Sequence, residues 1–222
     1  MKQTKNKVLA EQKQLETEHR LLRAQMNPHF MFNALNSIQS FISENNTMQA
    51  EIYLSRFARL MRYYLDSSSQ SFVPFQTEIE NVRLNLELEQ LRLNFRFHFE
   101  IIEPEDCEDL EIPPMLAQPF IENAVRHGFR QKEENGFLQI VYEREGMNLK
   151  CTITDNGIGR EAAAKNKTHN NKVMSKGISI TKGRLQALFP KQNISELLKI
   201  TDLYAADGKA AGTKVEFRFP YN

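Results

Sequence analysis

Residues 151–159 read Cys151-Thr152-Ile153-Thr154-Asp155-Asn156-Gly157-Ile158-Gly159. The alternation of the first residues predicts a strand, with Asp155 on the same face as Cys151 and Ile153. A carboxylate therefore lies at the edge of a buried face, next to two glycines that let the backbone pass close to a ligand. A carboxylate only accepts hydrogen bonds, which suits an exocyclic amine such as that of adenine. Taken alone, the stretch favours an ordinary Asn-Gly turn between two elements over a ligand site.

Strand and helix patterns alternate around this stretch, from residue 72 to the end. We expect strands over residues 95–101, 137–143, 148–155, 198–204 and 213–219, and helices over residues 78–93, 114–127 and 177–189. This mixture predicts an α+β fold, a two-layer sandwich with helices on one face of the sheet.

The preceding part of the chain has a helical pattern throughout, over residues 7–68. The polar residues 44–47 separate a first helix from a second one over residues 50–65 and supply its N-cap. A helical hairpin cannot enclose its own core, so we expect a homodimer that pairs two hairpins in a four-helix bundle. A polar linker then divides the chain into residues 1–71 and 72–222.

The first helix carries His29 directly after Pro28. Helical spacing places it on a polar face with Asn33, Asn36, Ser37 and Ser40. The apolar residues of the helix fall on the opposite side, at Met31, Leu35, Ile38 and Ile42. We therefore expect an outward-facing imidazole beside a bend, because Pro28 has no N–H to donate.

A third group of polar residues reads Glu122-Asn123-Ala124-Val125-Arg126-His127-Gly128. Asn123 and His127 are four residues apart and project from one helix face, with Gly128 as the C′ residue. An Asn oxygen is a ligand suited to Mg²⁺, a His can donate to a phosphate, and Glu122 could deprotonate a nucleophile. The alternative is a surface pair of Glu122 and Arg126 beside an ordinary polar Asn123.

Two weaker stretches follow. Ser175-Lys176-Gly177-Ile178-Ser179 opens the helix expected over residues 177–189, and a helix N-terminus with a cation suits phosphates. Gly212-Thr213 precedes the last strand, where a plain turn is the alternative.

Composition excludes several classes of protein. The chain has 222 residues and a net charge of +1, from 29 basic and 28 acidic residues, which gives no bias toward nucleic acid. Cys107 and Cys151 lie far apart without a metal-type spacing, so a reducing compartment is expected. No apolar run is long enough to span a bilayer and no signal peptide is evident, which predicts a cytosolic chain.

The order of these motifs resembles the sensor histidine kinases of the LytS type. The resemblance covers about residue 15 to the end. It is carried by Gln25-x-Asn27-Pro28-His29-Phe30-x-Phe32-Asn33-x-Leu35-Asn36, by Pro113-Pro114-x-Leu116-x-Gln118-Pro119-x-x-Glu122-Asn123-Ala124-x-x-His127-Gly128, and by Asp155-Asn156-Gly157-x-Gly159.

The resemblance implies a dimerisation and histidine-phosphotransfer hairpin followed by a GHKL (Bergerat-type) ATP-binding domain. It implies that ATP and Mg²⁺ are used to phosphorylate His29, from which the phosphoryl group passes to an aspartate of a response regulator. Such kinases usually carry an N-terminal membrane sensor, so this chain would be the cytoplasmic portion of an inner-membrane protein, with a signalling helix before Leu15.

The same resemblance assigns roles to single residues. Asn123 would hold Mg²⁺, Asp155 would anchor adenine and Thr213 would support it. Gly157 and Gly159 would let the nucleotide in, under a mobile ATP lid over residues 160–176. His127, Lys176, Gly177 and Ser179 would lie at the phosphates, and Glu122 is the candidate general base because Phe30, not a carboxylate, follows His29.

Two other functions stay open. Ser179 stands where the family commonly has glycine, so the chain could be a kinase-like dimeric scaffold with weakened ATP binding. It could also be a GHKL ATPase of the chaperone or DNA-repair class, although such an enzyme has no need of an exposed histidine in a hairpin.

Overall fold

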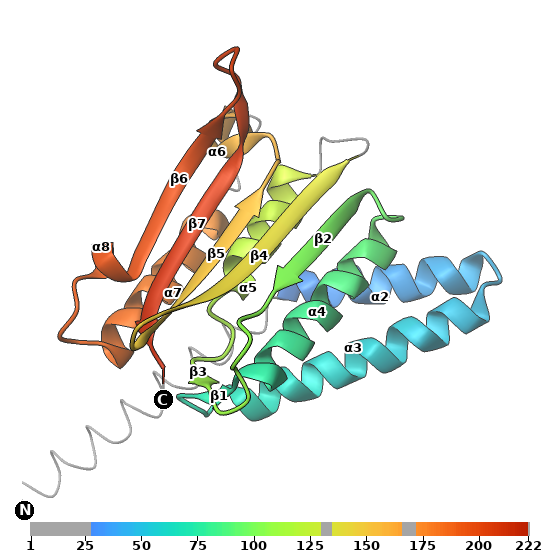
Figure 1. Cartoon of the computed structure of the whole chain (residues 1–222). Coiled ribbons are helices and arrows are strands. Elements are labelled where there is room, and N and C mark those ends of the chain that lie inside the picture. The colour runs from blue at the N-terminus through green and yellow to red at the C-terminus, as the bar shows by residue number, and fades with distance from the viewer. Residues whose placement is uncertain (1–27, 130–134, 166–171, 222) are drawn as a thin grey trace, which may run out of the picture. The chain divides into compact units, whose positions relative to one another are not determined.

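The structure is a computed structural model that describes residues 28–129, 135–165 and 172–221. The chain divides into two compact units, Met1–Gln70 and Ser71–Asn222. Figure 1 traces both, and each is described by itself. The signalling helix expected before Leu15 and the bend expected before His29 lie outside the described residues.

The first unit contains a helical hairpin. Helix α2 spans Pro28–Ser43 and α3 spans Thr47–Ser67. The expected N-cap is confirmed, since the Asn46 side chain accepts from the Gln49 N–H at 3.2 Å. Ring pairs join the two helices, with centroids 5.9 Å apart for Phe30 and Phe57 and 5.8 Å apart for Phe41 and Tyr53.

The face of α2 that is buried differs from the expected one. Phe30 and Ala34 are buried, whereas Leu35 and Ile42 of the predicted apolar face are 55% and 56% exposed. The reason is that α2 carries two apolar stripes, and its aromatic stripe packs on α3. Of the second stripe, Leu35 and Ile42 are left exposed in the single chain, and Met31 and Ile38 are half-buried.

The second unit is built on a mixed five-stranded sheet. Its strands are β2 (Phe97–Ile102), β4 (Gly136–Glu145), β5 (Asn148–Asp155), β6 (Leu198–Tyr204) and β7 (Ala210–Pro220). Their order is β2-β4-β5-β7-β6, with β2 parallel to β4 and the other neighbours antiparallel. Two short strands, β1 (Val73–Pro74) and β3 (Glu111–Ile112), form a separate antiparallel sheet.

Helices accompany the sheet and complete the α+β fold predicted from the sequence. They are α4 (Phe75–Arg92), α5 (Gln118–Asn123), the π-helix η1 (Ala124–Gly128), α6 (Gly159–Lys165), α7 (Lys172–Leu188) and α8 (Ile194–Leu197). Figure 1 shows α5 and α7 together behind the strands. Residues that alternate along β5 are buried at Leu149, Cys151, Ile153 and Asp155, because this face meets the helices.

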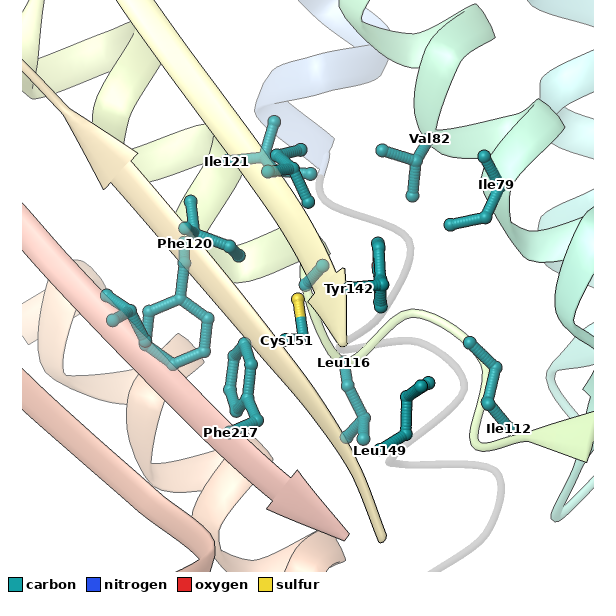
Figure 2. Packing of buried hydrophobic residues seen from close by; sticks show 14 of the residues in the cluster. Ile79, Val82, Ile112, Leu116, Phe120, Ile121, Tyr142, Leu149, Cys151 and Phe217 are labelled. Atoms are coloured by element: carbon teal, nitrogen blue, oxygen red, sulfur yellow. The ribbon is translucent and has the colours of Figure 1, made fainter. Parts of the chain in front are cut away.

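The buried core joins the helices to the sheet. Phe120 of α5 and Phe217 of β7 meet edge to face with centroids 4.9 Å apart, and Phe75 of α4 meets Tyr142 of β4 at 5.1 Å. Figure 2 shows Phe120 opposite Phe217, with Cys151 nearby on the same face of the sheet. This packing fixes α5, and with it the residues that follow α5 in the chain.

Two helix predictions need correction. The helix expected over residues 114–127 begins only at Gln118, because Met115, with a φ of 58°, interrupts it after two prolines. Gly128 is not a left-handed C′ residue but the last residue of η1. The helix expected from Gly177 begins at Lys172.

The two cysteines test the packing of this core. Both thiols are free and buried, and burial raises the pKa of the Cys151 thiol to about 12. We expect neither thiol to react with a thiol reagent at pH 8 in the native protein, Cys151 because only the thiolate attacks and Cys107 because the folded chain buries it. Both should react after unfolding in guanidinium. A Met147→Cys variant provides the positive control, since Met147 is 76% exposed, and fast reaction of the unaltered native chain would contradict the packing.

Candidate functional site

Asp155 is the last residue of β5 and is 8% exposed. Its Oδ1 accepts a hydrogen bond from the Gly157 N–H at 2.8 Å, which orients the carboxylate. Thr213 of β7 lies directly opposite Asp155 in the register. Residues opposite one another project from the same face, so the sheet places a carboxylate and a hydroxyl side by side.

Two glycines at this point cannot be replaced by larger residues. A Cβ on Gly157 would lie 2.4 Å from the Cα of Gly128, and one on Gly212 would lie 1.9 Å from the Asp155 carbonyl oxygen. The Ile158 N–H donates to the Gly128 carbonyl at 3.2 Å. The turn after β5 is therefore locked against the end of η1, and this contact determines where Asp155 points.

The polar residues Asn123 and His127, on α5 and η1, lie in the same pocket as Asp155. Asn123 ends α5 and His127 lies in η1, whose turn is closed by the Phe129 N–H donating to Ala124 O at 3.0 Å. The switch from α to π geometry inserts a residue into the helix, a feature frequently found at functional sites. Both Asn123 and His127 line one pocket, as their four-residue spacing predicts.

That pocket contains about 470 Å³ of empty space, part of it open to solvent. It lies entirely in the second unit. Its lining comprises Phe120, Asn123, Ala124, His127, Gly128, Asp155, Gly159, Arg160, Ala163, Ile178, Ile200, Thr213 and Val215. Five residues predicted from the sequence thus meet in one pocket, at Asn123, His127, Asp155, Gly159 and Thr213.

Other predicted residues lie elsewhere. Gly177 is inside α7, where a Cβ would lie 3.3 Å from that of Pro119, so this glycine allows α7 to approach α5. Ser179 is exposed and does not line the pocket, whereas its neighbour Ile178 does. Glu122 is outside the lining, and its Oε1 accepts from Gln118 Nε2 at 3.2 Å.

Other expectations concern His29, Lys176 and the lid. The side chains of His29 and Lys176 lie outside the described residues. The lid expected over residues 160–176 is not one continuous loop, because α6 occupies its first part and α7 its last. The run of three alanines in α6 was the signal for this helix, since alanine has the highest helix propensity.

Arg160 is the principal lining residue that the motifs did not identify. It lies in α6 and pairs with Asp202 of β6 through two contacts of 2.6 Å, from Nε to Oδ1 and from Nη2 to Oδ2. The hydrogen bond from Arg160 lowers the pKa of Asp202, and the same bond raises the pKa of Arg160. Both groups therefore stay charged throughout the neutral pH range.

The residues of the pocket suit a planar, partly polar ligand. Ile178, Ile200 and Val215 provide apolar walls, and the Asp155 carboxylate accepts hydrogen bonds at one end. This combination matches a purine base with an exocyclic amine. Asn123 supplies an oxygen of the kind that Mg²⁺ binds together with phosphates.

Comparisons with known proteins show the family of this chain. The model of the histidine kinase family matches residues 17–97. LytS of Bacillus cereus, a sensor protein, is 30% identical over 211 residues, 92% of this chain and 34% of its own length. The chain belongs to the histidine kinases, in the group of LytS.

Two further relatives are themselves sensor proteins. The sensor histidine kinase BtsS of Escherichia coli K12 is 37% identical over 143 residues, 64% of this chain and 25% of its own length. LytS of Oceanobacillus iheyensis is 29% identical over 211 residues, 93% of this chain and 35% of its own length. The chain thus spans between a quarter and about a third of the length of these relatives.

Solved structures give a weaker likeness. The mycobacterial sensor histidine kinase MprB has a TM-score of 0.46 at 16% identity, over 68% of this chain and 97% of that one. The histidine kinase domain of a blue-light activated kinase from Erythrobacter litoralis has a TM-score of 0.46 at 15% identity, over 93% of this chain and 95% of that one.

Proposed function

We propose that this chain is the kinase part of a two-component sensor, which uses ATP to phosphorylate its own His29. The observation that carries this proposal is the meeting of Asp155, Thr213, Asn123 and His127 in one pocket of a histidine kinase family member. These residues come from three separate segments, and an incidental surface turn would not bring them together.

The base of ATP binds at the sheet end of the pocket. Asp155 accepts a hydrogen bond from the adenine amine, and Thr213 supports the same edge from the neighbouring strand. Gly157 and Gly159 keep the turn after β5 tight, so that the Asp155 carboxylate faces the ligand. Adenine is favoured over guanine because guanine has a carbonyl oxygen where adenine has its amine.

The phosphates lie toward α5 and η1. Asn123 holds Mg²⁺, which neutralises phosphate charge when bound, and His127 donates to a phosphate oxygen. A phosphate contact by Ser179 or by the backbone at Gly177 does not fit their places on α7, so the serine does not argue for a weakened site. Lys176 stays a proposed phosphate ligand.

The acceptor of the phosphoryl group is His29. One imidazole nitrogen forms the bond to the γ-phosphorus as the bond to ADP breaks, and the proton of the imidazole leaves to a base. An unperturbed His is largely neutral at pH 7, so it is ready to attack. Glu122 stays the candidate base, and this role requires its side chain to turn away from Gln118.

The phosphoryl group then passes to an aspartate of a response regulator that docks on the hairpin. The relatives' names, which describe sensors, support a place for this chain on the cytoplasmic side of a membrane sensor. Among the described residues, no helix is long and apolar enough to cross a membrane.

The test uses γ-labelled ATP with Mg²⁺. The proposal predicts label on the protein that is lost in acid and stable in alkali, as phosphohistidine requires. Intact ATP binding without label would instead favour the scaffold. Steady hydrolysis over many turnovers, unaffected by His29→Gln, would favour an ATPase of another GHKL class.

The chain is proposed to act as a homodimer, and exposed apolar residues support this. On α2 the second, partly exposed stripe repeats at Met31, Leu35, Ile38 and Ile42, and on α3 a similar spacing repeats at Leu54, Met61 and Leu65. Leu54 and Leu65 are 51% and 56% exposed, like Leu35 and Ile42 of α2. Two hairpins that pair through these stripes form a four-helix bundle.

A double substitution, Leu35→Glu with Ile42→Glu, is expected to convert the dimer to monomers. Burying each such side chain contributes about 1.5–3 kcal/mol, so the dissociation constant should rise at least ~100-fold. Analytical ultracentrifugation measures this. Gln39→Glu, an exposed change on the same helix, is the matched control and should stay dimeric. An unchanged dimer in the double variant would rule out this interface.

A further inference from the structure

We propose that Arg160 contacts the base or ribose of the bound nucleotide, and that Asp202 is the positioning residue that holds it there. This inference rests on the proposed function, because it takes the ligand of the pocket to be ATP. Arg160 lines the pocket, and both oxygens of Asp202 are within 2.6 Å of its guanidinium nitrogens. A bidentate pair fixes the plane of the guanidinium as well as its position.

The place of the pair in the sheet supports a role at the base. Asp202 lies opposite Thr213 in the register, and Thr213 lies opposite Asp155. The three side chains therefore form one row across β6, β7 and β5 on the same face. Arg160 reaches this row from α6 and forms a wall at the end of the pocket that holds the adenine anchor.

The chemistry of the pair also favours the base over the phosphates. Asp202 occupies two of the five guanidinium N–H donors of Arg160, and the remaining donors and the flat face stay available. Because the carboxylate neutralises the guanidinium, the pair offers little net attraction to phosphate. A guanidinium held in a plane stacks well on an aromatic ring, and among the described lining residues Arg160 carries the only permanent positive charge.

The pair also fixes α6. Arg160 is the second residue of that helix, and Ala163, one turn later, lines the pocket as well. The preceding Gly159 has a φ of 76° and lies close to Ala210 of β7. The ion pair thus ties the start of α6 to β6, an edge strand of the sheet, so that Arg160 and Ala163 keep their places in the pocket wall.

The test is equilibrium binding of ATP, ADP and AMP to the full chain, measured by calorimetry. Arg160→Ala is expected to weaken all three ligands by about the same factor, roughly 10-fold, since a contact to base or ribose is common to them. Arg160→Lys should weaken the affinities nearly as much, because the lysine ammonium keeps the positive charge but lacks the planar guanidinium. Asp202→Asn should weaken the affinity for each nucleotide about 3- to 5-fold, because Arg160 is then present but no longer fixed by a bidentate ion pair.

A matched control is Arg218→Ala, which removes the ion pair of Arg218 with Glu145, away from the pocket lining. It should leave all three affinities unchanged. Thermal unfolding of each variant separates affinity from stability. If Arg160→Ala does not fold, Arg160→Lys gives the same test.

Three outcomes would contradict the inference. Unchanged affinities in a folded Arg160→Ala chain would make the pair a structural ion pair only. A loss that is large for ATP and absent for AMP would move Arg160 to the phosphates. Failure of the unaltered chain to bind any of the three nucleotides would overturn the proposed function, and this inference with it.

Discussion

In a His29→Gln variant, the acid-labile label taken up from γ-labelled ATP is expected to fall to background. Glutamine keeps the size and polarity of the side chain but has no nucleophilic nitrogen. ATP affinity should stay that of the unaltered chain, because the pocket residues all belong to the second unit. Label uptake and calorimetric ATP binding, measured on the same preparation, give the two values.

His98→Gln is the matched control for this change. His98 is an exposed histidine on β2 in the second unit, outside the pocket lining. The His98→Gln chain should take up label at the same rate as the unaltered chain. Label that persists in His29→Gln, or disappears in both variants, would contradict the assignment of His29 as acceptor.

Asp155→Asn is expected to weaken ATP binding at least ~100-fold, about 2.7 kcal/mol, with the fold preserved. The amide oxygen of asparagine can still accept the hydrogen bond from Gly157 N–H, so the turn after β5 is kept. The amide NH₂ group, however, faces the amine of adenine, and two donors cannot pair. Calorimetry measures the affinity, and thermal unfolding checks the fold.

Thr154→Val is the control for Asp155→Asn. Thr154 precedes Asp155 on β5, so its side chain projects from the opposite face of the strand. The ATP affinity of the Thr154→Val chain should match that of the unaltered chain. ATP binding by Asp155→Asn at the normal affinity would remove Asp155 from the nucleotide site.

Much of the second unit could be predicted from its strands. β5 and β6 match the expected bounds. Along β5, strict alternation marks a strand with one buried face, and this alternation also places Asp155 on that face. The spacing of Asn123 and His127 likewise predicts their shared face, even though the helix between them changes from α to π geometry. Local patterns are sufficient where one periodicity dominates.

Features that depend on distant residues could not be predicted. The sequence near Gly177 does not indicate that this residue lies inside a helix. A glycine is needed there because Pro119, 58 positions earlier in the chain, packs against it. The pairing of Arg160 with Asp202 joins residues 42 positions apart, and only the register of β6 with β7 brings Asp202 to the pocket. The two apolar stripes of α2 have similar spacing, so periodicity alone does not decide which of them packs on α3.

The position of the phosphoryl group on the chain decides directly whether His29 is the acceptor. The chain is incubated with ATP and Mg²⁺, digested under alkaline conditions and mapped by mass spectrometry. We expect one phosphoryl group, on His29. A phosphoryl group on any other residue, or ATP binding without phosphorylation of the chain, would contradict this expectation.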